Sequence, residues 1–407
     1  MVGNGLGGTS LINANVFLEA DESLLSMDFW PSEIRKNPKA MKKYYKAVRD
    51  VLEPEAYPDH WPALKKMQLF ERQAKAIGMS DRLYRVPQTT RFRPGPNSCG
   101  VNMNPSTLTG QDAMGINDGS KTTTLVTYLA DSWNWGAEMF CQCEVRHVEK
   151  ASEERGGGYI VYFAWHGHGR ERFEDRVKED LMWVHARKAV FLGAGAIGTT
   201  EILLRSKAMG LSMSDRVGQG MSGNGDMLAF SYNTDTEVNA VGRPFPCPTN
   251  PVGPTITSII DYRKGLENPL NGFVIQEGAI PQGLCEFLQT MMDMMPGRQN
   301  DSNKSLIGRA RDAVGEWKSR LLGPFVPDGA IEKTQVFLIM SHDGSQATLS
   351  LKNDKPVLEF IGVGRSDRVE QLNSLLAKAT AAVGGTLVQS PFYAAMGQQQ
   401  ITVHPLG

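Results

Sequence analysis

Apolar positions recur in two different patterns along this chain, and the change falls near residue 122. Before it, they recur at helical spacing over 38–52, where Pro54 ends the pattern, and again over 64–78. Two helices are therefore predicted there. The next stretch, 87–124, is polar and rich in Gly and Pro, and a loop of that length is more often functional than an idle connection.

After residue 122, short apolar runs separated by turns predict mainly strands. A short helix at 124–130 leads to strands at 137–148 and 159–165, and further strands run through 182–192. We expect these strands to form a β-meander that closes on a buried apolar strand. The last of them, 189–192, leads directly into a glycine-rich turn and a helix.

The second half of the chain predicts a mostly antiparallel sheet with covering helices. The expected strands are 227–234, 257–261, 272–277, 335–341 and a hairpin over 347–360. Helices at 284–295 and 306–322 interrupt them, and Ser366 begins a further amphipathic helix. The helix at 284–295 is rich in Met, so it is either a buried helix or a flexible lid over a bulky apolar substrate.

Composition narrows the class of protein. The 407 residues are 41% hydrophobic and 21% charged with a formal net charge of −1, which is typical of a globular protein and gives no electrostatic reason to bind nucleic acid. No apolar run is long enough for a transmembrane segment. The 5 cysteines lack regular spacing, so a cytoplasmic or other intracellular reducing compartment is expected. Cys141 and Cys143 are interpreted as free buried thiols.

Two glycine-rich stretches have the spacing G-x-G-x-x-G. They are Gly3, Gly5 and Gly8, and Gly193, Gly195 and Gly198. A dinucleotide site requires a strand before this motif, a helix after it and a second strand that ends in an acid. The first stretch lacks the preceding strand, and the second is followed by loop-like residues. The second motif therefore remains open between close helix–strand packing and a nucleotide site, including that of an NAD(P)-dependent dehydrogenase.

The first stretch continues in a longer ordered pattern. Residues 3–20 read Gly-Asn-x-Leu-Gly-Gly-Thr-Ser-x-Ile-Asn-x-x-x-Phe-x-x-Ala, which resembles the flavin-binding signature of the glucose–methanol–choline (GMC) oxidoreductases. The resemblance implies FAD as cofactor. The residues it implies as FAD contacts are Gly7, Gly8, Asn13, Val16, Val145 and Gly195.

Two further segments are similar to the cholesterol oxidase branch of that family. Residues 191–206 resemble the second FAD-adjacent segment of the family, and depart from its glucose oxidase type. The turn Ser222-Gly223-Asn224-Gly225 resembles a Pro-Asn-Gly turn of the cholesterol oxidase branch. The resemblance implies an apolar, sterol-like alcohol as the substrate.

Two residues are candidates for the chemistry. Val403-His404-Pro405-Leu406-Gly407 resembles the His-Pro-Leu-Gly-Gly motif of the family, which implies that His404 acts on the substrate hydroxyl. Glu277 lies in a segment similar to the one that carries a catalytic glutamate in cholesterol oxidases. Burial among apolar neighbours would raise its pKa and suit a proton-shuttling base, whereas the alternative is a glutamate at a strand end that faces solvent.

A metal site is not expected. His166 and His168 share a turn and could bind a metal ion, but no third ligand lies nearby in the sequence. The alternative is an exposed hairpin tip, and we favour it.

The resemblance implies an α+β and α/β fold: an incomplete Rossmann-like FAD domain together with a substrate domain built on a large, mostly antiparallel sheet. The FAD-binding part is expected at 1–225, with an inserted segment at about 21–120. The substrate-binding part is expected at 226–385, and 386–407 returns to the FAD domain. Compared with the family, the chain looks truncated at both ends, so weak retention of FAD is expected.

The predicted function is oxidation of a CH–OH group of an apolar alcohol with FAD, with cholesterol or another 3-hydroxysteroid favoured and isomerisation of the product as a second step. The alternatives are an inactive fragment of such an enzyme and an NAD(P)-dependent dehydrogenase. The sequence predicts no oligomeric state.

Overall fold

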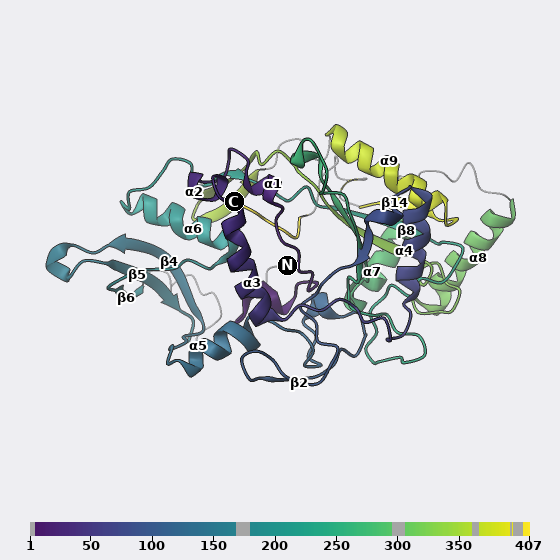
Figure 1. Ribbon diagram of the computed structural model, residues 1–407, viewed down its shortest axis with the longest axis horizontal. Coiled ribbons are helices and arrows are strands. Elements are labelled where there is room, and N and C mark those ends of the chain that lie inside the picture. The colour runs from purple at the N-terminus through teal and green to yellow at the C-terminus, as the bar shows by residue number, and fades with distance from the viewer. Residues whose placement is uncertain (1–4, 168–179, 295–305, 360–365, 391–392, 394–401) are drawn as a thin grey trace. The chain divides into compact units, whose positions relative to one another are not determined.

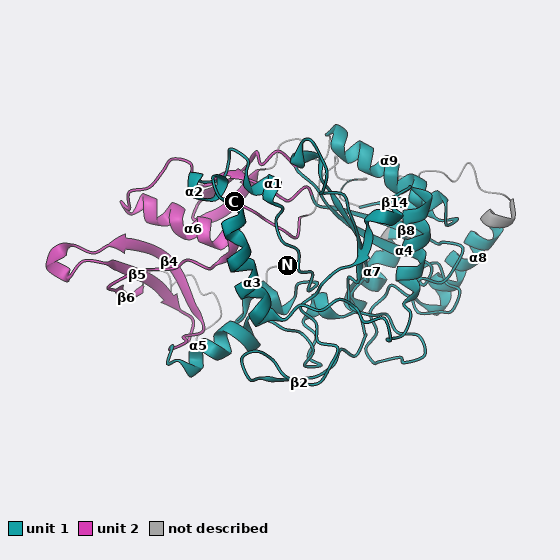
Figure 2. Ribbon diagram, viewed as in Figure 1, with its two compact units in different colours: residues 1–137, 226–342, 364–401 teal, residues 138–225, 343–363, 402–407 magenta. Residues whose placement is uncertain are grey.

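The computed structural model describes residues 5–167, 180–294, 306–359, 366–390, 393 and 402–407. The chain forms two compact units (Figure 2). Unit 1 comprises 1–137, 226–342 and 364–401, and unit 2 comprises 138–225, 343–363 and 402–407. Each unit is thus assembled from three separate segments of the chain. This grouping by compactness differs from the predicted division at 225 and 385, because residues 1–137 group with 226–342 and residues 343–363 join unit 2.

A six-stranded antiparallel sheet is the framework of unit 1. Its strand order is β1-β9-β10-β11-β8-β14. The strands are β1 (Leu83–Arg85), β9 (Ser258–Asp261), β10 (Val274–Gly278), β11 (Gln335–Met340), β8 (Met227–Tyr232) and β14 (Thr386–Gln389). Every position of β9 and β10 is buried, as expected for central strands that are covered on both faces.

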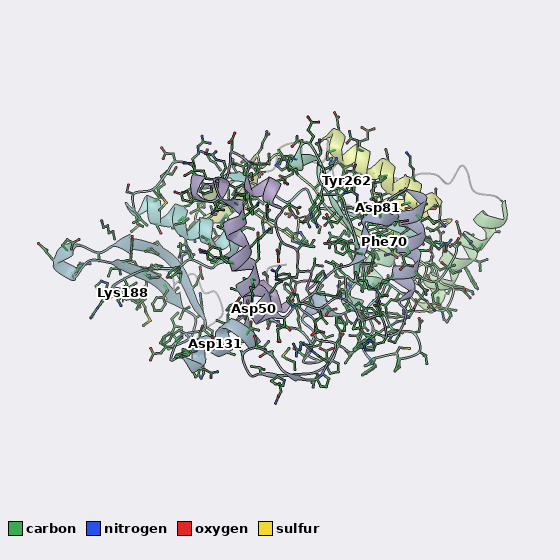
Figure 3. All side chains as sticks on the ribbon, in the orientation of Figure 1. Asp50, Phe70, Asp81, Asp131, Lys188 and Tyr262 are labelled. Carbon is green, nitrogen blue, oxygen red and sulfur yellow. The ribbon has the colours of Figure 1, made fainter. Side chains whose placement is uncertain are left out.

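Helices cover the first face of this sheet. α4 (Lys65–Ala76) and α9 (Asp367–Ala381) lie over it (Figure 1) and bury their apolar stripes, including Phe70 and Leu372, against strand residues. The Phe70 ring centroid lies 6.2 Å from that of Phe337 on β11, and Figure 3 labels Phe70 within this core. Burying such aromatic and aliphatic side chains stabilises the fold by about 1.5–3 kcal/mol each.

A different helix covers the opposite face. α7 (Cys285–Met294) packs Leu288 and Met292 against Phe230 and neighbouring strand residues. Met292 is only 1% exposed, which favours the buried-helix interpretation of the Met-rich segment. α8 (Leu306–Leu322) follows it in the chain.

The remaining elements of unit 1 are shorter and belong to its first chain segment. The helices are α1 (Glu22–Leu25), α2 (Ser32–Arg35), α3 (Met41–Leu52) and α5 (Ala130–Asn134), and a two-stranded sheet pairs β2 (Gly95–Pro96) with β3 (Asn102–Met103). A short π-helical turn, Leu125–Leu129, leads into α5.

Unit 2 contains two three-stranded antiparallel sheets and one helix, α6 (Gly195–Ala208), among its described residues. The first sheet has the order β4-β5-β6, formed by Cys143–Lys150, Tyr159–Trp165 and Met182–Ala186. The second has the order β13-β12-β7, formed by Lys355–Glu359, Ala347–Lys352 and Gln219–Met221. α6 packs against β4 and β12.

Most predicted elements are confirmed within a few residues. The helices at 38–52 and 64–78, the antiparallel strands of the second half and the helix after Ser366 all form. The meander β4-β5-β6 also forms. Ser366 holds the N-cap position of α9, although its side chain makes no capping hydrogen bond.

Three expectations about unit 2 are wrong. β6 ends at Ala186, so 189–192 is not a strand, and Phe191 is 95% exposed. β6 is not buried, because it is the edge of its sheet and exposes 63% of Trp183. Cys141 is exposed rather than buried, since it precedes β4 in a bend.

Candidate functional site

The glycine-rich stretch of unit 1 forms a tight turn that leads into a short 3-10 helix, Gly8–Leu11. Gly7 has φ 104°, and a Cβ atom there would lie 3.1 Å from the Leu125 Cβ atom, so this position requires glycine. The Ser10 hydroxyl donates to the Gly7 carbonyl at 2.6 Å, and the Thr124 hydroxyl donates to the same carbonyl at 2.8 Å. The Leu125 side chain and the hydroxyls of Ser10 and Thr124 therefore fix one side of the turn. Gly3 lies outside the described residues.

The other side of this turn is open. Gly8 has φ 59°, and among the residues that the structure describes a Cβ atom built on it would meet no heavy atom within 4 Å beyond its chain neighbours. The Asn13 side chain is exposed. A backbone that is fixed on one side and open on the other fits close approach of a flat or phosphorylated group, as expected for FAD.

A buried polar cluster lies directly behind this loop. Asn15, at φ 64°, donates from Nδ2 to the Asp112 carboxylate at 2.9 Å and to the Thr90 hydroxyl at 2.8 Å. The Asp112 carboxylate also accepts from the Thr255 amide at 2.9 Å. Lys121 donates to the Asp112 carbonyl at 2.7 Å and to the Asn13 carbonyl. These bonds hold the loop backbone at Asn13 and Asn15.

Burial perturbs both ionisable groups of this cluster. Desolvation raises the pKa of Asp112 and lowers the pKa of Lys121 to about 8, although the Asp112 carboxylate opposes the latter effect. Val16, the next residue implied as an FAD contact, packs against a buried cluster that includes Val274 and Ile259. Its side chain therefore anchors the loop to the sheet.

In unit 2, the second glycine motif begins α6. Gly195 has φ 72°, and a Cβ atom there would meet no heavy atom within 4 Å, so the backbone at this helix end is open. Val145 lies on β4, where the ladder to β5 changes register between Val145 and His147. All strand ladders among the described residues are antiparallel, so the parallel strand pair of an NAD(P) fingerprint is not present there.

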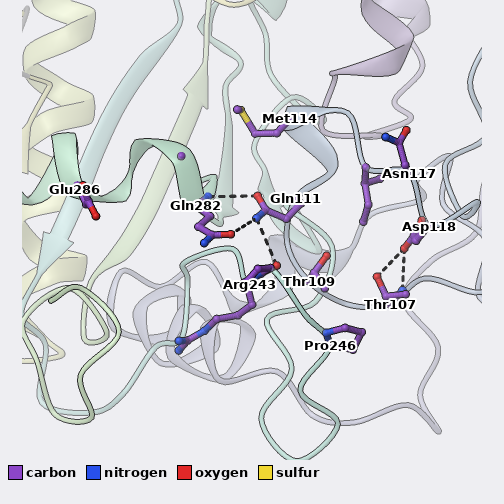
Figure 4. A pocket seen from close by; sticks show the side chains of 13 residues that line it. Thr107, Thr109, Gln111, Met114, Asn117, Asp118, Arg243, Pro246, Gln282 and Glu286 are labelled. Atoms are coloured by element: carbon purple, nitrogen blue, oxygen red, sulfur yellow. Dashed lines mark hydrogen bonds between the residues drawn. The ribbon is translucent and has the colours of Figure 1, made fainter.

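A pocket of about 810 Å³ opens in unit 1, lined in part by the irregular stretch between Thr107 and Asp118. Gly115 in this stretch approaches the Leu11 carbonyl of the glycine-rich segment, since a Cβ atom there would lie 3.6 Å from it. Figure 4 shows Gln111 and Gln282 joined by a hydrogen bond, with Gln111 Nε2 3.2 Å from Gln282 Oε1. The lining combines polar and apolar side chains: Thr107, Thr109, Gln111, Met114, Ile116, Asn117, Asp118, Arg243, Pro244, Pro246, Gln282, Gly283 and Glu286.

Glu277 lies on the central strand β10, and its side chain is on the sheet face that α4 covers. Its carboxylate accepts from the Lys66 ammonium at 2.8 Å and from the amides of Thr257 and Ser258 at 2.9 Å each. The side chains of Lys66 and Glu277 are both 0% exposed. The alternative of a glutamate at a strand end that faces solvent is therefore wrong.

The sheet separates Glu277 from the glycine-rich segment. Successive residues of a strand point to opposite faces, and Ile275 and Glu277 point toward α4. Ala14 and Val16 pack with Val274, whose side chain points to the other face. Within unit 1, the carboxylate and the predicted FAD-contacting loop thus lie on opposite faces of the sheet.

His404 lies in unit 2, on a segment that pairs with the Ser222 turn. The amide of Leu406 donates to the Ser222 carbonyl, and the Ser222 amide donates back, at 2.8 Å each. The Thr402 hydroxyl donates to the Gly223 carbonyl at 2.9 Å and accepts from the His404 amide at 3.0 Å. The residues on both sides of His404 are therefore held by the turn that the sequence singled out separately.

The histidine turn is only partly described. His166 is buried, and its Nε2 atom lies 2.8 Å from the Glu144 carboxylate, whereas His168 is outside the described residues. Within the described part of the chain, no group of three or more His, Cys, Asp and Glu side chains is arranged to hold a metal ion.

Sequence reasoning missed the buried lysines Lys66 and Lys121 of unit 1. A signal for Lys66 was available, because Lys66, Phe70 and Ala74 follow at intervals of four and share one helix face. No comparable periodicity marks Lys121, which lies in the irregular stretch.

A sequence profile of the GMC oxidoreductases matches residues 1–223, more than half of the chain. The chain belongs to this family. The predicted fold class, a mixed α/β protein with a large antiparallel sheet, is confirmed, and FAD is the cofactor.

Comparison with solved structures finds an FAD-dependent oxidoreductase from Chaetomium thermophilum, solved in complex with a butanamide fragment. It is 14% identical in sequence with a TM-score of 0.47, and the match covers 96% of this chain and 71% of that one. No curated protein matches the chain. None of the described helices is long and apolar enough to cross a membrane.

Proposed function

We propose that this protein oxidises a CH–OH group of an alcohol, with a sterol-like alcohol as the favoured substrate. The single observation that carries the proposal is the family match over residues 1–223, which assigns flavin-dependent redox chemistry. The sterol preference rests on the resemblance of the Ser222 turn and the Glu277 segment to cholesterol oxidases. The polar side chains that line the pocket in unit 1, among them Gln111, Arg243 and Glu286, favour a smaller, more polar alcohol as the second candidate.

Within unit 1, the residues that we propose to contact the cofactor are Gly7, Gly8 and Asn13. For unit 2, the family resemblance separately implies Gly195 and Val145 as contacts. Their fit to a flavin rests on the open backbone beside Gly8 and Gly195. When bound, FAD supplies the acceptor for the hydride that leaves the alcohol carbon.

His404 is the residue that we propose to act on the substrate. It accepts the proton from the hydroxyl oxygen while the carbon–hydrogen bond is cleaved, and the product is a carbonyl compound. General base catalysis of this kind contributes about 10²–10⁴-fold to a rate. The hydrogen bonds at Thr402 and Leu406 restrict the backbone of His404 and so limit the entropy lost on reaching the reactive geometry.

Glu277 enters the proposal as the residue that moves a proton on a β,γ-unsaturated ketone product. Its neighbours define what this role requires. The acid in contact with its carboxylate is Lys66, at 2.8 Å, and burial lowers the pKa of Lys66. A proton shuttle through Glu277 therefore needs the ion pair to open and the product to reach the sheet face that α4 covers, opposite the glycine-rich segment.

A substrate panel tests the proposal. The protein is supplied with FAD under anaerobic conditions and mixed with a 3-hydroxysteroid, benzyl alcohol or a hexose. The readout is loss of the flavin absorption band at about 450 nm. We expect the steroid to bleach the flavin. Bleaching by the hexose or benzyl alcohol alone would refute the sterol preference, and no bleaching by any alcohol would refute alcohol oxidation.

Product analysis separates the two candidate residues. With the steroid, Glu277→Gln is expected to form the ketone with its double bond unshifted, and His404→Gln to form almost no ketone. A shifted double bond in the Glu277→Gln product would remove Glu277 from the mechanism.

A further inference from the structure

A single carboxylate, Asp343, fastens the turn on which the His404 segment rests. It lies just before β12 in unit 2 and is partly buried. Its Oδ1 atom accepts from the Ser222 hydroxyl at 2.8 Å, and its Oδ2 atom accepts from the Gly223 amide at 2.6 Å. The two oxygens of the carboxylate therefore bind two consecutive residues, Oδ1 binding Ser222 and Oδ2 binding Gly223.

The turn that Asp343 binds is shaped by the same hydroxyl group. The Ser222 Oγ atom donates to Asp343 and accepts from the Asn224 amide at 2.9 Å, and Asn224 has φ 59°. An asparagine in the left-handed region has a conformational cost, so the turn needs such contacts to persist. The Asp343 Oδ1 atom also accepts from the Ser345 amide at 3.0 Å, which fixes the carboxylate itself.

The other side of this turn carries the His404 segment. Ser222 exchanges two backbone hydrogen bonds with Leu406, and the Gly223 carbonyl accepts from Thr402 at 2.9 Å. These three hydrogen bonds between the turn and the segment all involve Ser222 or Gly223. These are the two residues that Asp343 holds.

We propose that Asp343 is the positioning residue for His404. It acts through the Ser222–Gly223 turn and does not touch the substrate. Hydrogen bonds to a charged acceptor are stronger than those between neutral groups, so losing them is sufficient to loosen a short two-residue bridge. The inference rests on the proposed role of His404, and it adds a residue for which the sequence offered no motif.

The catalytic consequence follows from geometry. A histidine that samples several positions accepts the hydroxyl proton only in a fraction of them, which lowers kcat. Substrate binding at groups other than His404 is unaffected, so KM is expected to change little.

Two variants and a matched control test this inference. Asp343→Ala removes both acceptors, and Asp343→Asn keeps one acceptor and the shape of the side chain. Asp215→Ala is the control, because it removes the same charge from unit 2 at a side chain that is 98% exposed and pairs with Lys207.

The first readout is hydrogen exchange at the amides of Ser222 and Leu406, measured by NMR on the whole chain, and it needs no turnover. We expect exchange in Asp343→Ala to be at least about tenfold faster than in the wild type, the control to match the wild type, and Asp343→Asn to lie between them. Unchanged exchange in Asp343→Ala would overturn the inference.

The second readout is kcat and KM with FAD and the alcohol that bleaches the flavin. We expect kcat to fall about tenfold or more in Asp343→Ala at nearly constant KM, with partial recovery in Asp343→Asn. Faster exchange with unchanged kcat would overturn the positioning role. If instead His404→Gln keeps full turnover, the proposed role of His404 fails, whereas the exchange result still reports whether Asp343 holds the segment.

Discussion

The large sheet of unit 1 and the ion pairs of unit 2 differ in how far their carboxylates are exposed to water. Unit 1 places a complete ion pair, Lys66 with Glu277, inside the core with both side chains 0% exposed. In unit 2 the Arg146 side chain is only 8% exposed, but its partner Asp354, in the turn between β12 and β13, is 50% exposed and also binds the guanidinium group of Arg205.

This difference follows from how the two sheets are covered. Helices lie on both faces of the unit 1 sheet, so any polar group there loses its water and must find partners within the protein. The edge strand β6 of the meander exposes 63% of Trp183 and 53% of Val184, so water reaches that sheet. We therefore expect large effects of charge removal in unit 1 and small ones in unit 2.

The largest effect is expected for Glu277→Ala. This change leaves the Lys66 ammonium buried without its carboxylate, and breaking a buried pair from one side costs about 3–5 kcal/mol. Urea unfolding measures the loss. The double variant Lys66→Met with Glu277→Leu removes both charges and is expected to recover most of it. Stability in Glu277→Ala equal to the wild type would refute the ion pair.

The next effect is a pH dependence from Glu332 in unit 1. Burial raises the pKa of this carboxyl from 4.5 to about 7, against the opposing effect of Arg243. The folded state therefore binds more protons than the unfolded state between these pH values, so stability falls as pH rises through this window, by at most about 3 kcal/mol.

Glu332→Gln isolates this contribution. The variant is expected to lose less stability than the wild type between about pH 5 and about pH 8, because its amide does not titrate. Urea unfolding at both pH values measures the difference. An identical pH dependence in the two proteins would contradict the raised pKa.

The smallest effect is expected for Asp354→Asn in unit 2. The change weakens the bonds to Arg146 and Arg205, but the carboxylate is half exposed, so the expected loss is about 1 kcal/mol. Thermal unfolding at low and high salt checks it, because the loss should shrink as salt screens the pair. A loss as large as that of Glu277→Ala would break the contrast between the two units.

The sequence predicts where helices and strands form better than it predicts how deeply each of them is buried. Helical and strand periodicity located α4, α9 and the strands of the large sheet, because local spacing determines which side of an element is apolar. It failed at β6, where an apolar strand was expected to be buried but lies at the edge of its sheet. Edge position depends on strand order, which periodicity does not contain.

The same limit applies to the site. The glycine motif and His404 were identified from local patterns, whereas the groups that hold them come from far along the chain. Thr124, which binds the Gly7 carbonyl, is 117 residues away from it, and Asp343 and Ser222 are 121 residues apart. Such contacts depend on the completed fold, so they require the structure.

The most direct test of the central claim is the rate of flavin reduction by alcohol in wild type and His404→Gln, both supplied with FAD and followed anaerobically by stopped flow. We predict that the wild type reduces its flavin and that His404→Gln does so about 10²–10⁴-fold more slowly, with its affinity for FAD retained. Equal rates in the two proteins would contradict the claim that His404 accepts the hydroxyl proton.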